Sequence, residues 1–106
     1  MNYRFMRVLV FFDLPVLTAK ERREYRRFRN ELLKNGFIML QESVYCRMAL
    51  NKTYADQAVA QIKRMKPSKG LVMSLMVTEK QFQNMEIITG EYSTDVINSD
   101  ERLVIL

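Results

Sequence analysis

An uninterrupted apolar run, Val8–Phe12, ends in Asp13, and Pro15 closes the segment two residues later. Residues 3–13 alternate loosely before they become continuously apolar, a pattern typical of a buried central strand. The chain has 106 residues, which is enough for one hydrophobic core and too few for two. The sequence therefore predicts one domain built around this strand.

The basic segment after Pro15 has the sequence signals of a helix at both ends. Thr18 and Glu21 have the spacing of a capping box, and the Asn35-Gly36 pair is a typical C-terminal cap. We expect the helix to run through Lys20–Lys34. One narrow apolar stripe of this helix is expected to face a sheet, and it consists of Tyr25, Phe28 and Leu32.

The elements after Gly36 are predicted from the same kinds of signal. Phe37–Leu40 and Ser43–Met48 are expected to form one long strand around a bend near Gln41. Asn51 is expected to cap a second helix that ends before Pro67. The remaining predictions are a third strand at Gly70–Val77, a helical turn at Thr78–Met85 and a short fourth strand at Glu86–Thr89.

These elements predict an α+β fold with two layers. Their apparent order is β-α-β-α-β-β, which lacks one strand break of the ferredoxin-like order β-α-β-β-α-β. We expect a ferredoxin-like two-layer sandwich, an antiparallel sheet with two helices on one face, over residues 1–90. Residues 91–106 are expected to be a connector and a C-terminal strand. Because Leu103–Leu106 are too few to build a core, this strand should dock on the chain's own sheet or on a partner.

Composition excludes several kinds of site. The chain has no histidine and one cysteine, so imidazole catalysis, histidine zinc sites and an internal disulfide are all excluded. A bound metal would need oxygen ligands, which favours magnesium, manganese or calcium. No apolar run is long enough to span a bilayer, so we expect no membrane contact and a reducing, cytoplasmic location, with Cys46 buried.

Charge is distributed unevenly along the chain. The net charge is +5, and residues 1–34 carry nine Lys or Arg against four Asp or Glu. Residues 79–106 reverse the sign, with six acids and two bases. A basic body favours a polyanionic partner, and an acidic tail favours a different contact.

Asp13 has two interpretations. An aspartate before Leu-Pro is good turn chemistry, so it can be a turn residue. It can also be a metal ligand held at the end of a rigid strand. One carboxylate is a poor magnesium site, but a two-fold dimer would duplicate it and could place both copies around one hydrated ion.

The basic helix also leaves two interpretations open. Its arginines can form a solvated face, paired with Glu21, Glu24 and Glu31, or they can bind phosphates. The candidate phosphate ligands are Arg22, Arg23, Arg26 and Arg27. A second basic patch consists of Lys63, Arg64, Lys66 and Lys69.

Three motifs together resemble a known family. They are the apolar first strand ending in Asp13, the basic helix closing at Gly36, and Gln41–Tyr45 after it. At these spacings the chain resembles the small CRISPR-associated endoribonuclease family, the non-integrase subunit of the spacer-acquisition complex.

This resemblance implies a ferredoxin-like homodimer with Mg²⁺ bound by Asp13. It also implies that the dimer bridges dimers of the CRISPR integrase subunit and binds duplex DNA, with a magnesium-dependent endonuclease activity on single-stranded RNA or double-stranded DNA. Two alternatives are a free-standing metal-dependent endoribonuclease and a non-catalytic RNA-binding module.

Overall fold

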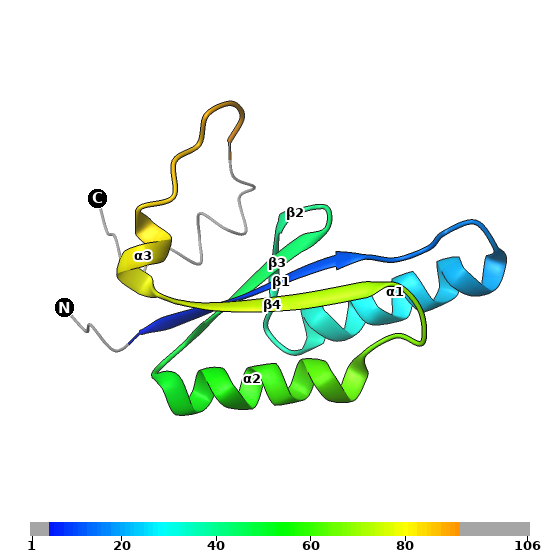
Figure 1. Cartoon of the computed structure of the whole chain (residues 1–106), viewed down its shortest axis with the longest axis horizontal. Coiled ribbons are helices and arrows are strands. Elements are labelled where there is room, and N and C mark those ends of the chain that lie inside the picture. The colour runs from blue at the N-terminus through cyan, green and yellow to red at the C-terminus, as the bar shows by residue number, and fades with distance from the viewer. Residues whose placement is uncertain (1–4, 92–106) are drawn as a thin grey trace.

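The apolar run of the sequence lies in β1 (Met6–Asp13), one of the two inner strands of a four-stranded sheet. The computed structural model describes residues 5–91. The other elements within this range are α1 (Ala19–Lys34), β2 (Ile38–Gln41), β3 (Val44–Ala49), α2 (Lys52–Met65), β4 (Leu71–Thr78) and α3 (Glu79–Gln83). The strand order is β2-β3-β1-β4, and every neighbouring pair is antiparallel (Figure 1). This is the predicted ferredoxin-like α+β architecture.

The prediction of one long strand after Gly36 was wrong. The chain reverses direction at Glu42 and Ser43, so β2 and β3 form an antiparallel hairpin. An irregularity in the pairing between Met39 and Gln41 marks the predicted bend. With the hairpin, the order through β4 becomes β-α-β-β-α-β. The turn was missed because it contains no glycine, proline or asparagine and no residue with positive φ.

Both long helices pack on one face of the sheet. Alternate residues of β1 point to that face, and the fully buried Val8 and Val10 contact the apolar stripe of α1, including Phe28 and Leu32. From α2 the same core receives Ala55, Ala58, Ile62 and Met65. The helix caps are those predicted: Thr18 and Glu21 form a capping box, and the Asn51 side chain accepts a hydrogen bond from the Tyr54 N–H.

The opposite face of the sheet is only partly covered. Leu9 and Cys46 are buried there beneath Phe82 of α3, which confirms that the cysteine is a buried side chain. The outward side chains of β4, in contrast, are about half exposed: Leu71, Met73 and Leu75 have exposed fractions of 54%, 52% and 52%. We call this side of the sheet the open face.

A buried ion pair attaches α3 to one end of the open face. Arg7 is fully buried, and its Nε donates to Glu79 Oε1 at 2.7 Å. The Arg7 guanidinium carbon also lies 4.4 Å from the centroid of the Phe82 ring. The Glu79 N–H donates to the Phe5 carbonyl at 2.9 Å. These contacts connect the two ends of the described chain and place α3 across the start of β1.

The chain after α3 differs from the prediction. Residues 86–89 do not form the expected fourth strand, because they pair with none of the four strands described. Met85, Ile87 and Ile88 are exposed. The predicted C-terminal docking strand lies outside the described residues. Within residues 5–91, no helix combines the length and the apolar character needed to cross a bilayer.

The buried ion pair generates the first prediction. Arg7→Met should lower the free energy of unfolding by about 3–5 kcal/mol, because the buried Glu79 carboxylate loses its counter-ion. The double variant Arg7→Met/Glu79→Gln should cost less than the sum of the two single substitutions. Urea denaturation of the three variants measures these values.

A matched control is the exposed ion pair between Lys52 and Asp56, whose atoms lie 3.0 Å apart. Lys52→Ala should cost less than about 1 kcal/mol. If Arg7→Met costs no more than this control, the buried pair does not hold α3 in place.

Candidate metal and nucleic-acid site

Asp13 is the last residue of β1, and its carboxylate is exposed. Because side chains alternate along a strand, Asp13 shares the open face with Leu9 and Phe11. It pairs in register with Leu71, the first residue of β4. The structure therefore places the predicted metal ligand at one end of an exposed apolar surface.

The backbone on both sides of Asp13 is tightly held. Phe12 packs in an aromatic cluster, with its ring centroid 5.3 Å from Phe28, 5.5 Å from Tyr45 and 5.9 Å from Tyr25. Leu14, on the other side, is buried. Since its neighbours are fixed, the Asp13 carboxylate stands on rigid backbone, as a metal ligand requires.

Gly70 also belongs to this site, and the sequence analysis missed it. Its φ is +94°, and a Cβ built at this position would lie 2.7 Å from the Asp13 carbonyl oxygen. A side chain would therefore both strain the backbone and collide with the end of β1. The available signal was a glycine directly before a predicted strand.

Among the residues that the structure describes, Asp13 does not belong to a metal-binding cluster of acidic side chains. Over residues 5–91, the structure contains no group of three or more His, Cys, Asp or Glu side chains able to hold a metal. Within residues 5–91, Asp13 thus offers a hard oxygen ligand without such a cluster around it. That donor fits a magnesium ion which keeps most of its waters.

Side chains at the start of α1 form hydrogen bonds with the backbone N–H groups there. The Glu21 carboxylate accepts hydrogen bonds from the N–H groups of Thr18 and Leu17, at 3.0 and 2.9 Å. The Thr18 contact is the main cause that lowers the pKa of Glu21 below its usual value. Arg22 donates to the carbonyls of Val16 and Leu17 at 3.2 and 3.0 Å, so it fastens the preceding loop to the helix.

Arg27 is the most constrained of the four candidate arginines. Its guanidinium forms ion pairs with Glu24 at 2.8 Å and Glu31 at 3.2 Å, and the hydrogen bond to Glu24 is the largest cause that raises its pKa. It also donates to the carbonyl of Met65, the last residue of α2, at 3.3 Å. Arg27 therefore connects the two helices.

Arg23 and Arg26 are exposed, and the described residues offer them no hydrogen bond or ion pair. Their charges are available to an external anion. The four arginines thus share one helix but differ in how much of their hydrogen-bonding capacity is already used.

Comparison with known proteins places this geometry in a family. Residues 6–85 match the model of the family described as CRISPR associated protein Cas2. The chain belongs to this family. The match begins at the first residue of β1 and continues through α3, so it contains Asp13 and the whole of α1.

Relatives of the same family match over nearly the full chain. A protein of Treponema denticola named CRISPR-associated endoribonuclease Cas2 is 55% identical over 101 residues, which are 95% of this chain and 100% of that protein. A protein of Ligilactobacillus salivarius with the same name is 48% identical over the same shares.

A solved structure described as "Crystal structure of cas2" superposes with a TM-score of 0.56 at 21% identity. The superposition covers 85% of this chain and 92% of that one. At this identity the likeness supports the ferredoxin-like fold alone.

The contacts of Arg27 generate the second prediction. Arg27→Gln should lower the free energy of unfolding by about 1 kcal/mol, because α1 loses its bond to the end of α2 and its ion pairs. Arg23→Gln, on the same helix but without such contacts, should change it by less than about 0.5 kcal/mol. Thermal melting of both variants measures the difference, and equal melting temperatures would contradict the structural role of Arg27.

Proposed function

We propose that the chain is the homodimeric subunit of the CRISPR spacer-acquisition complex that bridges dimers of the integrase subunit and binds duplex DNA. The observation that carries the proposal is the position of Asp13 on the open face. An apolar strand surface of this kind is expected to pack against another surface, and a second copy of the chain is the partner we propose. Two open faces related by a two-fold axis would pair the Asp13 carboxylates.

The apolar side chains that support dimerisation lie next to the proposed metal ligand. Leu71, Met73 and Leu75 are half exposed along β4, and Phe11 lies beside them on β1. Burying such a surface is favourable by roughly 25 cal/mol for each Å² of apolar area. The C-terminal strand of each chain is proposed to add to the partner's sheet.

We infer that the Asp13 carboxylates of the two copies hold Mg²⁺. When bound, the ion would stabilise negative charge on a phosphate and activate water. The protein's own contribution is to hold the carboxylates on rigid strand ends and to bind phosphates through α1, where Arg23 and Arg26 have free guanidinium groups. The chain has no histidine that could act as a general base.

A second candidate function is a free-standing metal-dependent endoribonuclease. The observation that favours it is the name of the relatives, which are called endoribonucleases. The two functions differ in whether cleavage or assembly depends on the site, and the two predictions below separate them.

The third prediction tests the open face as a dimer interface. Leu75→Lys should convert the dimer to a monomer, because two buried lysines would face each other across the two-fold axis. Sedimentation velocity measures the dimer, and co-elution with the integrase subunit measures the bridge; both should be lost together. Leu33→Lys, which changes an exposed leucine on α1, is the matched control and should leave both intact. A Leu75→Lys variant that remains dimeric would show that the open face is not the interface.

The fourth prediction concerns Asp13. Asp13→Ala should abolish any Mg²⁺-dependent cleavage of single-stranded RNA or duplex DNA, because the metal loses its protein ligand. Dimerisation and duplex binding should persist, since they depend on the apolar face and on the basic residues.

The control for this prediction is Asp56→Ala, which removes an exposed carboxylate on α2. Cleavage should be unchanged in that variant. Full cleavage by the Asp13→Ala variant would show that Asp13 takes no part in the reaction. Loss of the dimer in this variant would show that the residue has a structural role. If Asp13→Ala loses cleavage while wild-type protein fails to bind the integrase subunit, the free-standing nuclease is the better function.

A further inference from the structure

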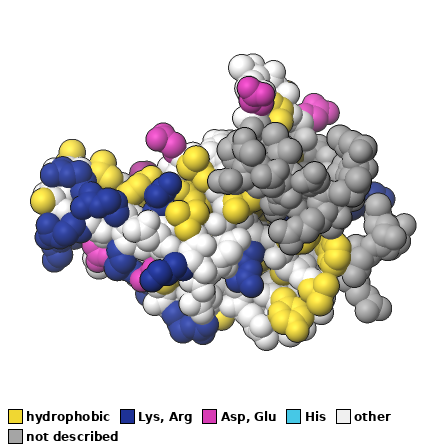
Figure 2. All heavy atoms as spheres, turned by 180° about the vertical axis from the view of Figure 1, so that it is seen from behind, with side chains coloured by type: hydrophobic (Ala, Val, Ile, Leu, Met, Phe, Trp, Pro, Cys, Tyr) yellow, Lys and Arg dark blue, Asp and Glu magenta, His cyan; other side chains and the backbone are white. Residues whose placement is uncertain are grey.

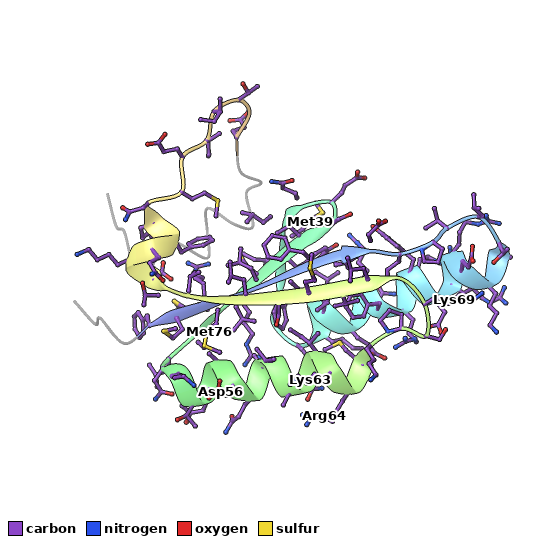
Figure 3. The ribbon with its side chains drawn as sticks, in the orientation of Figure 1. Met39, Asp56, Lys63, Arg64, Lys69 and Met76 are labelled. Atoms are coloured by element: carbon purple, nitrogen blue, oxygen red, sulfur yellow. The ribbon has the colours of Figure 1, made fainter. Side chains whose placement is uncertain are left out.

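The C-terminal half of α2 and the loop after it form a basic segment with no acidic residue. Residues 57–78 contain no Asp or Glu, and their four cations are Lys63, Arg64, Lys66 and Lys69. The acidic residue of α2, Asp56, lies toward the opposite end of the helix, where it pairs with Lys52 (Figure 3). The positive charge of this segment is therefore not neutralised along its own stretch of chain.

The three lysines of this segment lie on the surface, and Lys69 is near enough to the Glu21 carboxylate for its charge to help lower the pKa of that group. Lys63, Lys66 and Lys69 are exposed, and within residues 5–91 none of them has a hydrogen bond or an ion pair. Arg64 differs, because it donates to the side chain of Gln61. We call Lys63, Lys66 and Lys69 the lysine ridge.

The lysine ridge is continuous with the N-terminal half of α1. Arg27 contacts the carbonyl of Met65, which lies between Lys63 and Lys66 in the chain. A cleft of about 380 Å³ is lined from one side by Lys20 and Glu24 of α1 and from the other by residues 67–69. The loop that carries Lys69 thus lies against the start of α1.

The spacing along α1 decides which of its cations join this surface. Lys20, Arg23 and Arg27 follow one another at i, i+3 and i+7, so they occupy one side of the helix. Arg27 identifies that side as the one that faces α2. Figure 2 shows Lys and Arg side chains gathered at the end of the molecule where α1 begins.

The chemistry of this surface suits a phosphate backbone. Lysine ammonium groups are strongly hydrated point charges with three donors each, and they neutralise phosphates without reading bases. The apolar residues of this part of α2, Ile62 and Met65, point into the core. Lys63 and Lys66 also line a pocket together with apolar residues of β4, among them Leu71 and Met73. The positive charge of the ridge favours a nucleic-acid duplex, which carries one negative charge for about every 1.7 Å of its axis.

We propose that the lysine ridge, together with Lys20 and Arg23, is the main phosphate-contacting surface for duplex DNA, and that Arg27 positions it. This inference rests on the proposed DNA-binding function and assigns the contact to the α2 side of the helical layer. Arg27 contributes by holding the end of α2 against α1, while its charge stays paired with Glu24 and Glu31.

The test compares two triple variants with the same loss of charge. One removes the ridge (Lys63→Gln, Lys66→Gln and Lys69→Gln), and the other removes three exposed lysines elsewhere (Lys34→Gln, Lys52→Gln and Lys80→Gln). Binding of a fluorescein-labelled duplex is measured by anisotropy over a series of NaCl concentrations. The slope of log K against log salt should fall by about 3 in the ridge variant, roughly 1 for each phosphate that is no longer neutralised, and by much less in the control.

Two further measurements show whether the ridge variant is still folded and whether the charge of the lysines, rather than their shape, determines binding. The ridge variant should melt at the temperature of the wild type, since its lysines make no hydrogen bond or ion pair within the described fold. The variant Lys63→Arg/Lys66→Arg/Lys69→Arg should keep the wild-type slope, because the charges remain. A wild-type slope in the glutamine variant, or equal changes of slope in the ridge and control variants, would overturn the proposal.

The outcomes also distinguish this inference from the proposed function. If wild-type protein binds the duplex and the ridge variant binds equally well, the inference fails and the DNA-binding function stands. If wild-type protein does not bind the duplex at any salt concentration, both fail. Ridge-dependent binding to phosphatidylserine vesicles without duplex binding would likewise overturn the inference and would assign the ridge to a lipid surface.

Discussion

The packing of Phe12 is the contact on which the arrangement of the site depends. Its ring touches two aromatic residues of α1, Tyr25 and Phe28, and Tyr45 of β3. This one side chain of β1 therefore fixes how α1 is rotated about the helix axis and how far α1 lies from the sheet. That rotation turns the Arg27 side of the helix toward α2. The next residue after Phe12 is Asp13, so the same contact also holds the backbone that carries the exposed carboxylate.

Local signals predicted the parts of the fold that depend on neighbouring residues in the chain. The caps of α1 and α2 were readable because each is formed by residues three positions apart. The hairpin between β2 and β3 was not readable in the same way. Its turn is supported by a hydrogen bond from the Phe12 N–H to the Ser43 carbonyl, at 3.0 Å. That contact joins residues far apart in sequence, and no short motif encodes it.

The same distinction applies to the candidate site, where some residues follow from local sequence and others depend on distant parts of the chain. Alternation along β1 places Asp13 on the open face once the strand is recognised, so that part follows from sequence. Gly70 belongs to the site only because β4 begins beside the end of β1. Arg7 is one of the nine basic residues counted in residues 1–34, and its burial depends on Glu79, which lies 72 positions further along the chain. The second carboxylate of the proposed metal site would belong to another copy of the chain, so the sequence suggested it only through two-fold symmetry.

The ion pair between Arg7 and Glu79 has a consequence for how such a chain can diverge. Replacing Arg7 first leaves the buried Glu79 carboxylate without this counter-ion, so that route away from the pair passes through a destabilised intermediate. Surface pairs such as Lys52 and Asp56 carry no such barrier and are free to drift one residue at a time. Over evolutionary time, the pair should therefore resist substitution. It keeps α3 anchored at the start of β1 while the solvent-facing residues around it are substituted more freely.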